Sequence, residues 1–422
     1  MSQLFHSETG RVLYLESEEV ARWRHARKVF HLPRRFAGGG TLFVLAKSRK
    51  DCCCPLRVRV NGRPAGSIAP DHHYYLSWFT LRLRAADLRG GRNVVEFSAD
   101  NEAMDGWLLG LEPGARAADS ALSVDAGRTW QRERLGVHHA LCGEYVVRLR
   151  LDDPALCDPA PPPFVWERPD CPRFAALRAA LPARLRAFAD PWRRARALST
   201  WLSAQWPYRD DPGGPRDHHE YSPWDPLTTL SWQSADFGQY QSRPVAFCVH
   251  FGAAYVPFAL ALGLPTRALC GSSGTLARRG GHFVAEVWIE AWRKWCYVDP
   301  TCDFVFERGG MPLSLAEAAA LTEPESLACL RHGPRFRHLP EAKQRSRTAV
   351  FGTGVCFREW ALWPRNDFLS HPECTPPSHG ATYYAETDWR WVTDAPAAAA
   401  DPFPYHVAPA AVAPPPPRAW RR

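Results

Sequence analysis

The sequence lacks any apolar run of the roughly 20 residues that a membrane-spanning helix needs, and it has no pair of Cys-x-x-Cys motifs of the zinc-binding type. It is also poor in lysine, since only five of its 52 basic residues are Lys. The arginines are scattered among 44 acidic residues, so the net charge of +8 forms no basic stripe. These absences exclude an integral membrane protein and argue against a nucleic-acid partner.

No apolar segment precedes the first charged residues at the N-terminus, so no secretory signal is visible. Thirteen cysteines in a chain without such a signal predict a reduced, cytoplasmic protein in which most cysteines are buried packing residues. Under these conditions a single well-placed reactive cysteine is the feature to look for.

The sequence is long and rich in proline and tryptophan. Its 422 residues suggest two or three domains, and 39 prolines with 18 tryptophans indicate long ordered loops with aromatic anchors. We expect a multidomain protein, with an N-terminal all-β sandwich followed by an α+β core.

Residues 1–152 show the two-residue periodicity of strands that are buried on one side, as in LRVRVNG at 56–62 and NVVEFSA at 93–99. Turn pairs such as Asn61-Gly62 separate these runs. Their order resembles that of galactose-binding-like jelly rolls. Within this region, residues 123–130 resemble an Asp-box, a hairpin whose Asp and Gly have structural roles.

The remainder divides by composition. Residues 153–172 are a predicted proline-rich linker, and helical periodicity begins at 173. We expect the core to occupy 173–335 and an aromatic-rich extension to occupy 336–394. The Ala/Pro-rich segment 395–422 is predicted to be a disordered tail.

Three segments carry the chemistry, and they occur in the order cysteine, histidine, aspartate: PVAFCVHFGAAYVPFALALGLPTRALCG, GGHFVAEVWIE and RKWCYVDPT. Together they resemble the transglutaminase-like superfamily, which has a papain-like Cys-His-Asp core, over roughly residues 175–320. The resemblance implies that Cys248 is the nucleophile, His282 the base and Asp299 the acid that orients the imidazole.

Elementary chemistry agrees with these roles. A cysteine in the first turn of a helix faces unpaired amides and the positive end of the helix dipole, and both favour the thiolate. His282 shares a strand face with Glu286, and Asp299 shares a face with Tyr297. If a hairpin turned at Glu290–Ala291, His282 would lie opposite Asp299.

The motif departs from the family in two places. Ala246 stands where the family usually has Gly, and Pro257 must kink the cysteine helix. The groups that would donate hydrogen bonds to the oxyanion are not fixed by the motif. The Cys248 amide is one candidate, and the side chain of Gln241 is favoured as the second over those of Gln239 and Trp232. The neighbouring cysteines, at 270, 296 and 302, are interpreted as packing residues.

The predicted function is acyl transfer from an amide of a protein or peptide substrate through a thioester on Cys248, with hydrolysis favoured over cross-linking. No cofactor and no metal are expected. An alternative is an inactive scaffold whose sandwich binds a glycan or a protein, and another is a purely structural interaction protein.

Overall fold

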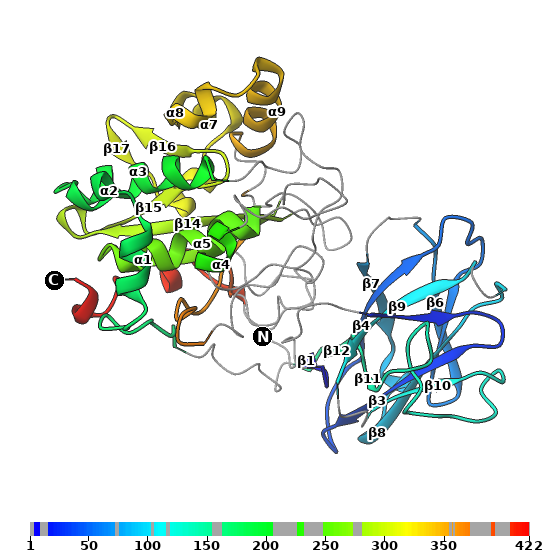
Figure 1. Cartoon of the computed structure of the whole chain (residues 1–422). Coiled ribbons are helices and arrows are strands. Elements are labelled where there is room, and N and C mark those ends of the chain that lie inside the picture. Colours follow the sequence, from blue (N-terminus) through cyan, green and yellow to red (C-terminus); the bar gives the residue numbers. More distant parts are fainter. Residues whose placement is uncertain are drawn as a thin grey trace.

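We describe a computed structural model of the chain, in which two lobes follow one another along the sequence (Figure 1). The structure describes residues 4–8, 16–71, 76–102, 105–114, 119–153, 163–205, 226–231, 248–272, 281–353, 357, 359–371, 390–392 and 406–421.

The first lobe is a β-sandwich of two antiparallel sheets, as predicted. The seven-stranded sheet contains β1 (Leu4–Phe5), β2 (Glu16–Val20), β4 (Gly40–Ser48), β7 (Ser77–Leu83), β9 (Trp107–Pro113), β11 (Gly143–Tyr145) and β12 (Val147–Leu151). The five-stranded sheet contains β3 (His25–Leu32), β5 (Leu56–Val60), β6 (Arg63–Ile68), β8 (Gly91–Ser98) and β10 (Ser120–Ser123).

Alternation along the strands builds the core of this sandwich. In β5 every second residue is buried, so Val58 points inward while Arg57 and Arg59 point out. The turn to β6 passes through Asn61 and Gly62, which both have positive φ angles (51° and 79°), the conformation that an Asn-Gly hairpin turn requires. The alternating pattern therefore fixes which side of the sheet is left to face outward.

The Asp-box is a structural hairpin, as the sequence predicts. The Asp125 carboxylate accepts hydrogen bonds from the backbone amide of Thr129 (2.8 Å) and from its hydroxyl (2.6 Å). Ser123 Oγ accepts the amide of Gly127, which has a φ of +85°. These bonds hold the pKa of Asp125 below its ordinary value.

The second lobe contains the transition to helix that the sequence predicts after residue 173. Its helices are α1 (Phe174–Ala180), α2 (Ala183–Ala187), α3 (Pro191–Ser203), α4 (Pro226–Ser231) and α5 (Cys248–Ala261). They accompany a six-stranded sheet in the order β15 (Lys294–Val298), β14 (Gly281–Ile289), β13 (Thr266–Ser272), β19 (Glu359–Leu362), β20 (Arg390–Val392) and β21 (His406–Val407).

A smaller three-stranded sheet lies beyond β15, accompanied by short helices. Its strands are β16 (Phe304–Arg308), β17 (Met311–Pro312) and β18 (Leu330–His332), and the helices are α6 (Leu315–Ala319), α7 (Glu323–Cys329), α8 (Pro334–Arg337) and α9 (Glu341–Phe351).

Helix α5 is apolar on all sides and packs on strands β13 and β14. Thirteen of its 14 residues are buried. Pro257 lies inside the helix, which continues through it to Ala261. The tight packing around α5 provides a physical reason why the helix tolerates a proline that would break an isolated one.

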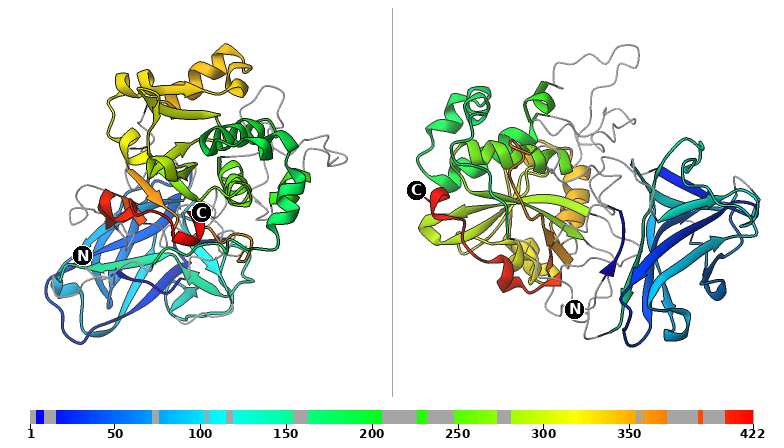
Figure 2. Two further views of the ribbon diagram at one scale, coloured as in Figure 1. Left: turned by 90° about the vertical axis from the view of Figure 1, so that its left-hand side faces the viewer. Right: turned by 90° about the horizontal axis from the view of Figure 1, so that it is seen from below.

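Two sequence predictions about the C-terminal third need correction. Strands β19 and β20, from the segment predicted as a separate extension, are paired directly into the sheet that carries His282. The prediction of a disordered tail is wrong for residues 406–421: Trp420 donates a hydrogen bond to the carbonyl of Glu167, and Trp295 donates one to that of Pro414. Figure 2 shows this red segment beside the second lobe.

The Ala/Pro composition predicts disorder, but a few aromatic side chains anchor the segment to the second lobe. Trp420 is buried against Phe174 and Trp166, with ring centroids 6.0 and 6.5 Å apart. Trp166 itself belongs to the predicted linker, whose residues 163–172 therefore pack on the second lobe.

In the part of the chain that the structure describes, no helix combines the length and apolar character that crossing a membrane requires.

Candidate functional site

His282 and Asp299 come together at the edge of the β14–β15 hairpin. The Nε2 atom of His282 donates to Oδ2 of Asp299 at 2.7 Å, and both residues are at most 1% exposed. His282 and Asp299 are not directly opposite one another but lie diagonally across the two strands. Ala285 is the residue opposite Val298, and the connection between the strands spans Glu290 to Arg293. The predicted two-residue turn is thus wrong by two register positions, but an even shift leaves both side chains on the same face.

The Asp299 side chain is held by its own turn. Its Oδ1 atom accepts the backbone amides of Thr301 (2.9 Å) and Cys302 (3.0 Å), which leaves Oδ2 for the histidine. This explains the Asp-Pro-Thr motif in physical terms: the turn after the strand presents two amides to one carboxylate oxygen. The carboxylate is therefore oriented before any substrate binds.

Cys248 is a second neighbour of the imidazole. It is the first described residue of α5, is 4% exposed, and its thiol lies close enough to His282 to act as a hydrogen-bonding partner. Because Nε2 is bound to Asp299, Nδ1 is the ring nitrogen left for the thiol; it is buried and makes no hydrogen bond to any described residue. The structure thus brings the three predicted residues together at the imidazole of His282.

The electrostatics of the site favour a charged imidazole. Burial lowers the pKa of His282, but the adjacent carboxylate of Asp299, the hydrogen bond to it and the Cys248 thiol together raise that pKa to about 10. At neutral pH His282 is therefore an imidazolium that can stabilise a thiolate and later donate a proton.

An aromatic ring covers the histidine. Phe351, at the end of α9, stacks on His282 with ring centroids 4.0 Å apart and an interplanar angle of 24°. Phe357 lies further along, 6.4 Å from the imidazole. Apolar cover of this kind keeps water from the His–Asp hydrogen bond and strengthens it. Phe351 and Phe357 come from the segment that the sequence analysis placed outside the core.

Cys302 is buried in the core, in agreement with its interpretation as a packing residue, and it also lies beside the His–Asp pair. Its thiol, the carboxylate of Asp299 and the imidazole of His282 each offer one metal-ligating atom, and these three atoms lie within 4.8 Å of one another. Burial and the neighbouring Asp299 raise the pKa of the Cys302 thiol well above its ordinary value. Cys302 is therefore a neutral thiol beside the His–Asp pair.

Two further motif residues, Arg267 and Glu286, form a buried ion pair behind the site. Both guanidinium donors Nε and Nη2 of Arg267 reach Oε2 of Glu286, at 2.9 and 2.5 Å. Both residues lie within the motifs of the sequence, which predict no role for either. Arg267 lies in the cysteine motif and Glu286 in the histidine motif, and these opposite charges within two apolar motifs were the signal that could have predicted the ion pair.

The proposed oxyanion donor Gln241 lies outside the described residues, as do Gln239 and Trp232. The role of Gln241 therefore stays a prediction. Cys270 and Cys296 are buried in the second lobe, in agreement with their interpretation as packing residues.

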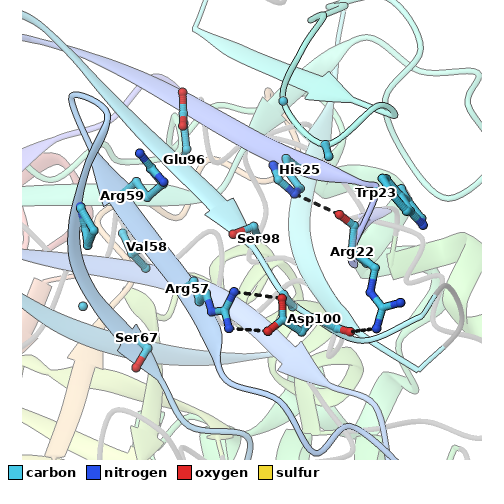
Figure 3. A pocket seen from close by; sticks show the side chains of 15 residues that line it. Arg22, Trp23, His25, Arg57, Val58, Arg59, Ser67, Glu96, Ser98 and Asp100 are labelled. Atoms are coloured by element: carbon cyan, nitrogen blue, oxygen red, sulfur yellow. Dashed lines mark hydrogen bonds and ion pairs between the residues drawn. The ribbon is translucent and has the colours of Figure 1, made fainter.

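A separate hollow of about 820 Å³ lies on the outer face of the five-stranded sheet (Figure 3). Arg57 and Arg59 of β5 project into it beside Glu96 of β8, and Arg57 forms an ion pair with Asp100. Trp23, which is 55% exposed, stands at its rim. The hollow combines three arginines and two carboxylates with an exposed aromatic ring.

Comparisons with known proteins find one family model that matches part of the chain. Residues 179–300 match the model of the transglutaminase-like superfamily. A solved structure of a candidate cysteine protease from Cytophaga hutchinsonii aligns at 12% identity, covering 71% of this chain and 79% of that one, with a TM-score of 0.23. No curated protein matches the chain. The matched residues include Cys248, His282 and Asp299.

Proposed function

We propose that this chain, whose residues 179–300 form a transglutaminase-like domain, is a cysteine enzyme that transfers acyl groups from amides of proteins or peptides. One observation carries the proposal: His282 is bound through Nε2 to Asp299 at 2.7 Å while the Cys248 thiol lies at the same imidazole. A buried thiol, base and carboxylate in this order are the parts that covalent catalysis requires.

In the proposed reaction the Cys248 thiolate attacks the amide carbonyl and forms a tetrahedral intermediate. The imidazolium of His282 donates its proton to the leaving amine, the C–N bond breaks, and a thioester remains on Cys248. An acceptor then gives a proton back to His282 and attacks the thioester, which releases the thiolate. Asp299 stabilises the imidazolium throughout, and the Cys248 amide with Gln241 would donate hydrogen bonds to the oxyanion.

We propose water as the acceptor, which makes the reaction hydrolysis of a peptide or amide bond. Water is the default acceptor of a thioester. An amine acceptor would instead produce cross-linking from the same thioester. The two outcomes differ in products, because hydrolysis releases a free acid and cross-linking releases a larger amide.

The test is alkylation of the native protein with iodoacetamide from pH 5 to 9, with every modified cysteine mapped by mass. At pH 6 we expect Cys248 to react faster than every other cysteine of the protein. Because the pKa of His282 is raised to about 10, the imidazolium keeps its proton over this whole range, and the Cys248 rate should not fall between pH 6 and 9 through loss of that proton.

In the His282→Ala variant the thiol should behave as an ordinary one, about tenfold slower at pH 6 and rising steeply with pH. His338→Ala removes an exposed histidine and serves as the matched control, which should alkylate like the wild type. A Cys248 that reacts no faster than the other cysteines, with the same pH dependence in all variants, would overturn the proposal.

A second candidate function is ligand binding by the sandwich, and the hollow in Figure 3 favours it. Its cationic residues, Arg22, Arg57 and Arg59, are partly offset by Glu96 and Asp100. Near balance of charge suits a neutral, hydroxyl-rich ligand better than a polyanion, and Trp23 offers a face for a sugar ring. A neutral oligosaccharide is the proposed ligand class.

The prediction is that Trp23→Ala weakens binding of a neutral oligosaccharide about tenfold in a glycan-array or calorimetric measurement. Leu327→Ala, which removes an exposed apolar side chain of α7, should leave binding unchanged. Equal affinity in the two variants, or binding of sulfated glycans alone, would contradict this use of the hollow.

A further inference from the structure

The group formed by His282, Asp299 and Cys302 offers one nitrogen, one oxygen and one sulfur donor. All three side chains are buried, and their ligating atoms lie within 4.8 Å of one another. Catalysis by the proposed mechanism uses only the first two. The presence of a third, soft donor at the same point is what the mechanism leaves unexplained.

These donors suit zinc. Zn²⁺ takes thiolate at about 2.3 Å and imidazole or carboxylate at about 2.0–2.2 Å, so donors around a tetrahedral ion stand about 3.3–3.6 Å apart. The His282–Asp299 contact of 2.7 Å would widen by less than 1 Å, and the turn that holds Cys302 already brings its sulfur within reach. Magnesium and calcium prefer all-oxygen sites and do not fit a thiolate.

The charges also fit a buried site. A Cys302 thiolate and the Asp299 carboxylate together neutralise the two positive charges of zinc, while His282 binds as a neutral imidazole. A neutral complex is the form that costs least to bury.

We propose that Zn²⁺ binds to His282, Asp299 and Cys302 and reversibly blocks the enzyme. On binding, the Nε2 proton of the imidazolium and the thiol proton of Cys302 leave to solvent, and N–Zn and S–Zn bonds replace them. The imidazole then carries its remaining proton on Nδ1 and can no longer accept one from the Cys248 thiol. A water molecule would complete the four ligands. The inhibitory half of this inference rests on the proposed function, whereas the binding half does not.

The simplest alternative gives Cys302 only a hydrogen bond to Asp299. The Cys302→Ser variant distinguishes zinc binding by Cys302 from this hydrogen bond, because a hydroxyl preserves the hydrogen-bond donor but is a poor ligand for zinc. Cys296→Ser is the matched control, since Cys296 is an equally buried cysteine of β15 that belongs to no metal-capable group among the described residues. Thermal unfolding of each variant checks that it folds.

Binding is measured on the full-length protein by competition for zinc with a chromophoric chelator, and by the near-ultraviolet sulfur-to-metal absorption of bound Co²⁺. We expect the Cys302→Ser variant to bind zinc at least tenfold more weakly and to lose one thiolate contribution to the cobalt band. The Cys296→Ser variant should match the wild type. Equal zinc affinity in Cys302→Ser and wild type would overturn the site.

Inhibition is measured by Cys248 alkylation at pH 6 with and without zinc. Zinc should slow this alkylation at least tenfold in the wild type, a chelator should restore it, and Cys302→Ser should be insensitive at the same zinc concentration. Zinc binding that depends on Cys302 but leaves alkylation unchanged would overturn the inhibitory half. If Cys248 is unreactive even without zinc, the proposed function fails, while the chelator and cobalt measurements still decide the metal site.

Discussion

Replacing Cys248 by alanine is expected to lower turnover of a peptide substrate by at least about 10⁴-fold while the fold is retained. The sulfur is the only atom in the proposed mechanism that bonds to the acyl group, and variants that remove the nucleophile of a comparable triad lose activity on this scale. The side chain is small and 4% exposed, so truncation removes one buried sulfur and little packing.

The measurement is a screen of peptide amides with and without added amine, with products identified by mass. Cys296→Ala removes a fully buried cysteine of the same lobe and should keep most of the activity. The two variants are compared after their thermal unfolding curves have been shown to agree with the wild type. Turnover in Cys248→Ala above a hundredth of the wild-type rate would mean that another group performs the chemistry.

The pairing of His282 with Asp299 was accessible from sequence because its spacing reflects simple geometry. Residues two apart on a strand share a face, so His282 and Asp299 could be assigned to one side of the hairpin once a turn with an even number of residues was assumed. The register itself could not be derived, since it depends on the four residues Glu290 to Arg293 and on the positive φ of 49° at Arg293. Because the error was an even number of residues, His282 and Asp299 remain on one face, 2.7 Å apart, and their catalytic roles stay a prediction.

Other parts of the site depend on contacts between segments that are distant in sequence. Phe351 reaches His282 from 69 positions further along the chain, and nothing in the local pattern of α9 distinguishes it from an ordinary apolar residue. Cys302 follows Asp299 by three positions, but only the turn that points both side chains to one spot reveals its proximity. The strands β20 and β21 are too short to be recognised by periodicity.

The second large effect concerns stability. Arg267→Met should lower the free energy of unfolding by about 3–5 kcal/mol, because it leaves the Glu286 carboxylate buried without its countercharge. The guanidinium also lies over the Trp295 ring at 4.0 Å and donates to the carbonyl of Val412 at 2.5 Å. Its loss therefore also weakens the attachment of the C-terminal segment to the sheet.

Adding Glu286→Gln to Arg267→Met should recover a large part of that loss. The amide is neutral, so the buried charge disappears, and its oxygen can still accept the backbone amide of Leu315, as Oε1 of Glu286 does at 2.6 Å. Replacing Glu286 by leucine would instead leave the Leu315 amide buried without a hydrogen-bond acceptor, at a cost of about 1–3 kcal/mol. Glutamine is therefore the better second substitution for the double variant.

Urea unfolding followed by tryptophan fluorescence measures these changes, with Arg308→Met as the control. Arg308 pairs with Glu325 at 3.7 Å, but both side chains are more than half exposed, so its loss should cost less than about 1 kcal/mol. An Arg267→Met variant no less stable than Arg308→Met would mean that Glu286 takes up a proton or gains water when its partner is removed. In that case the double variant would gain nothing over the single one, and the ion pair would have no role in holding the sheet that carries His282.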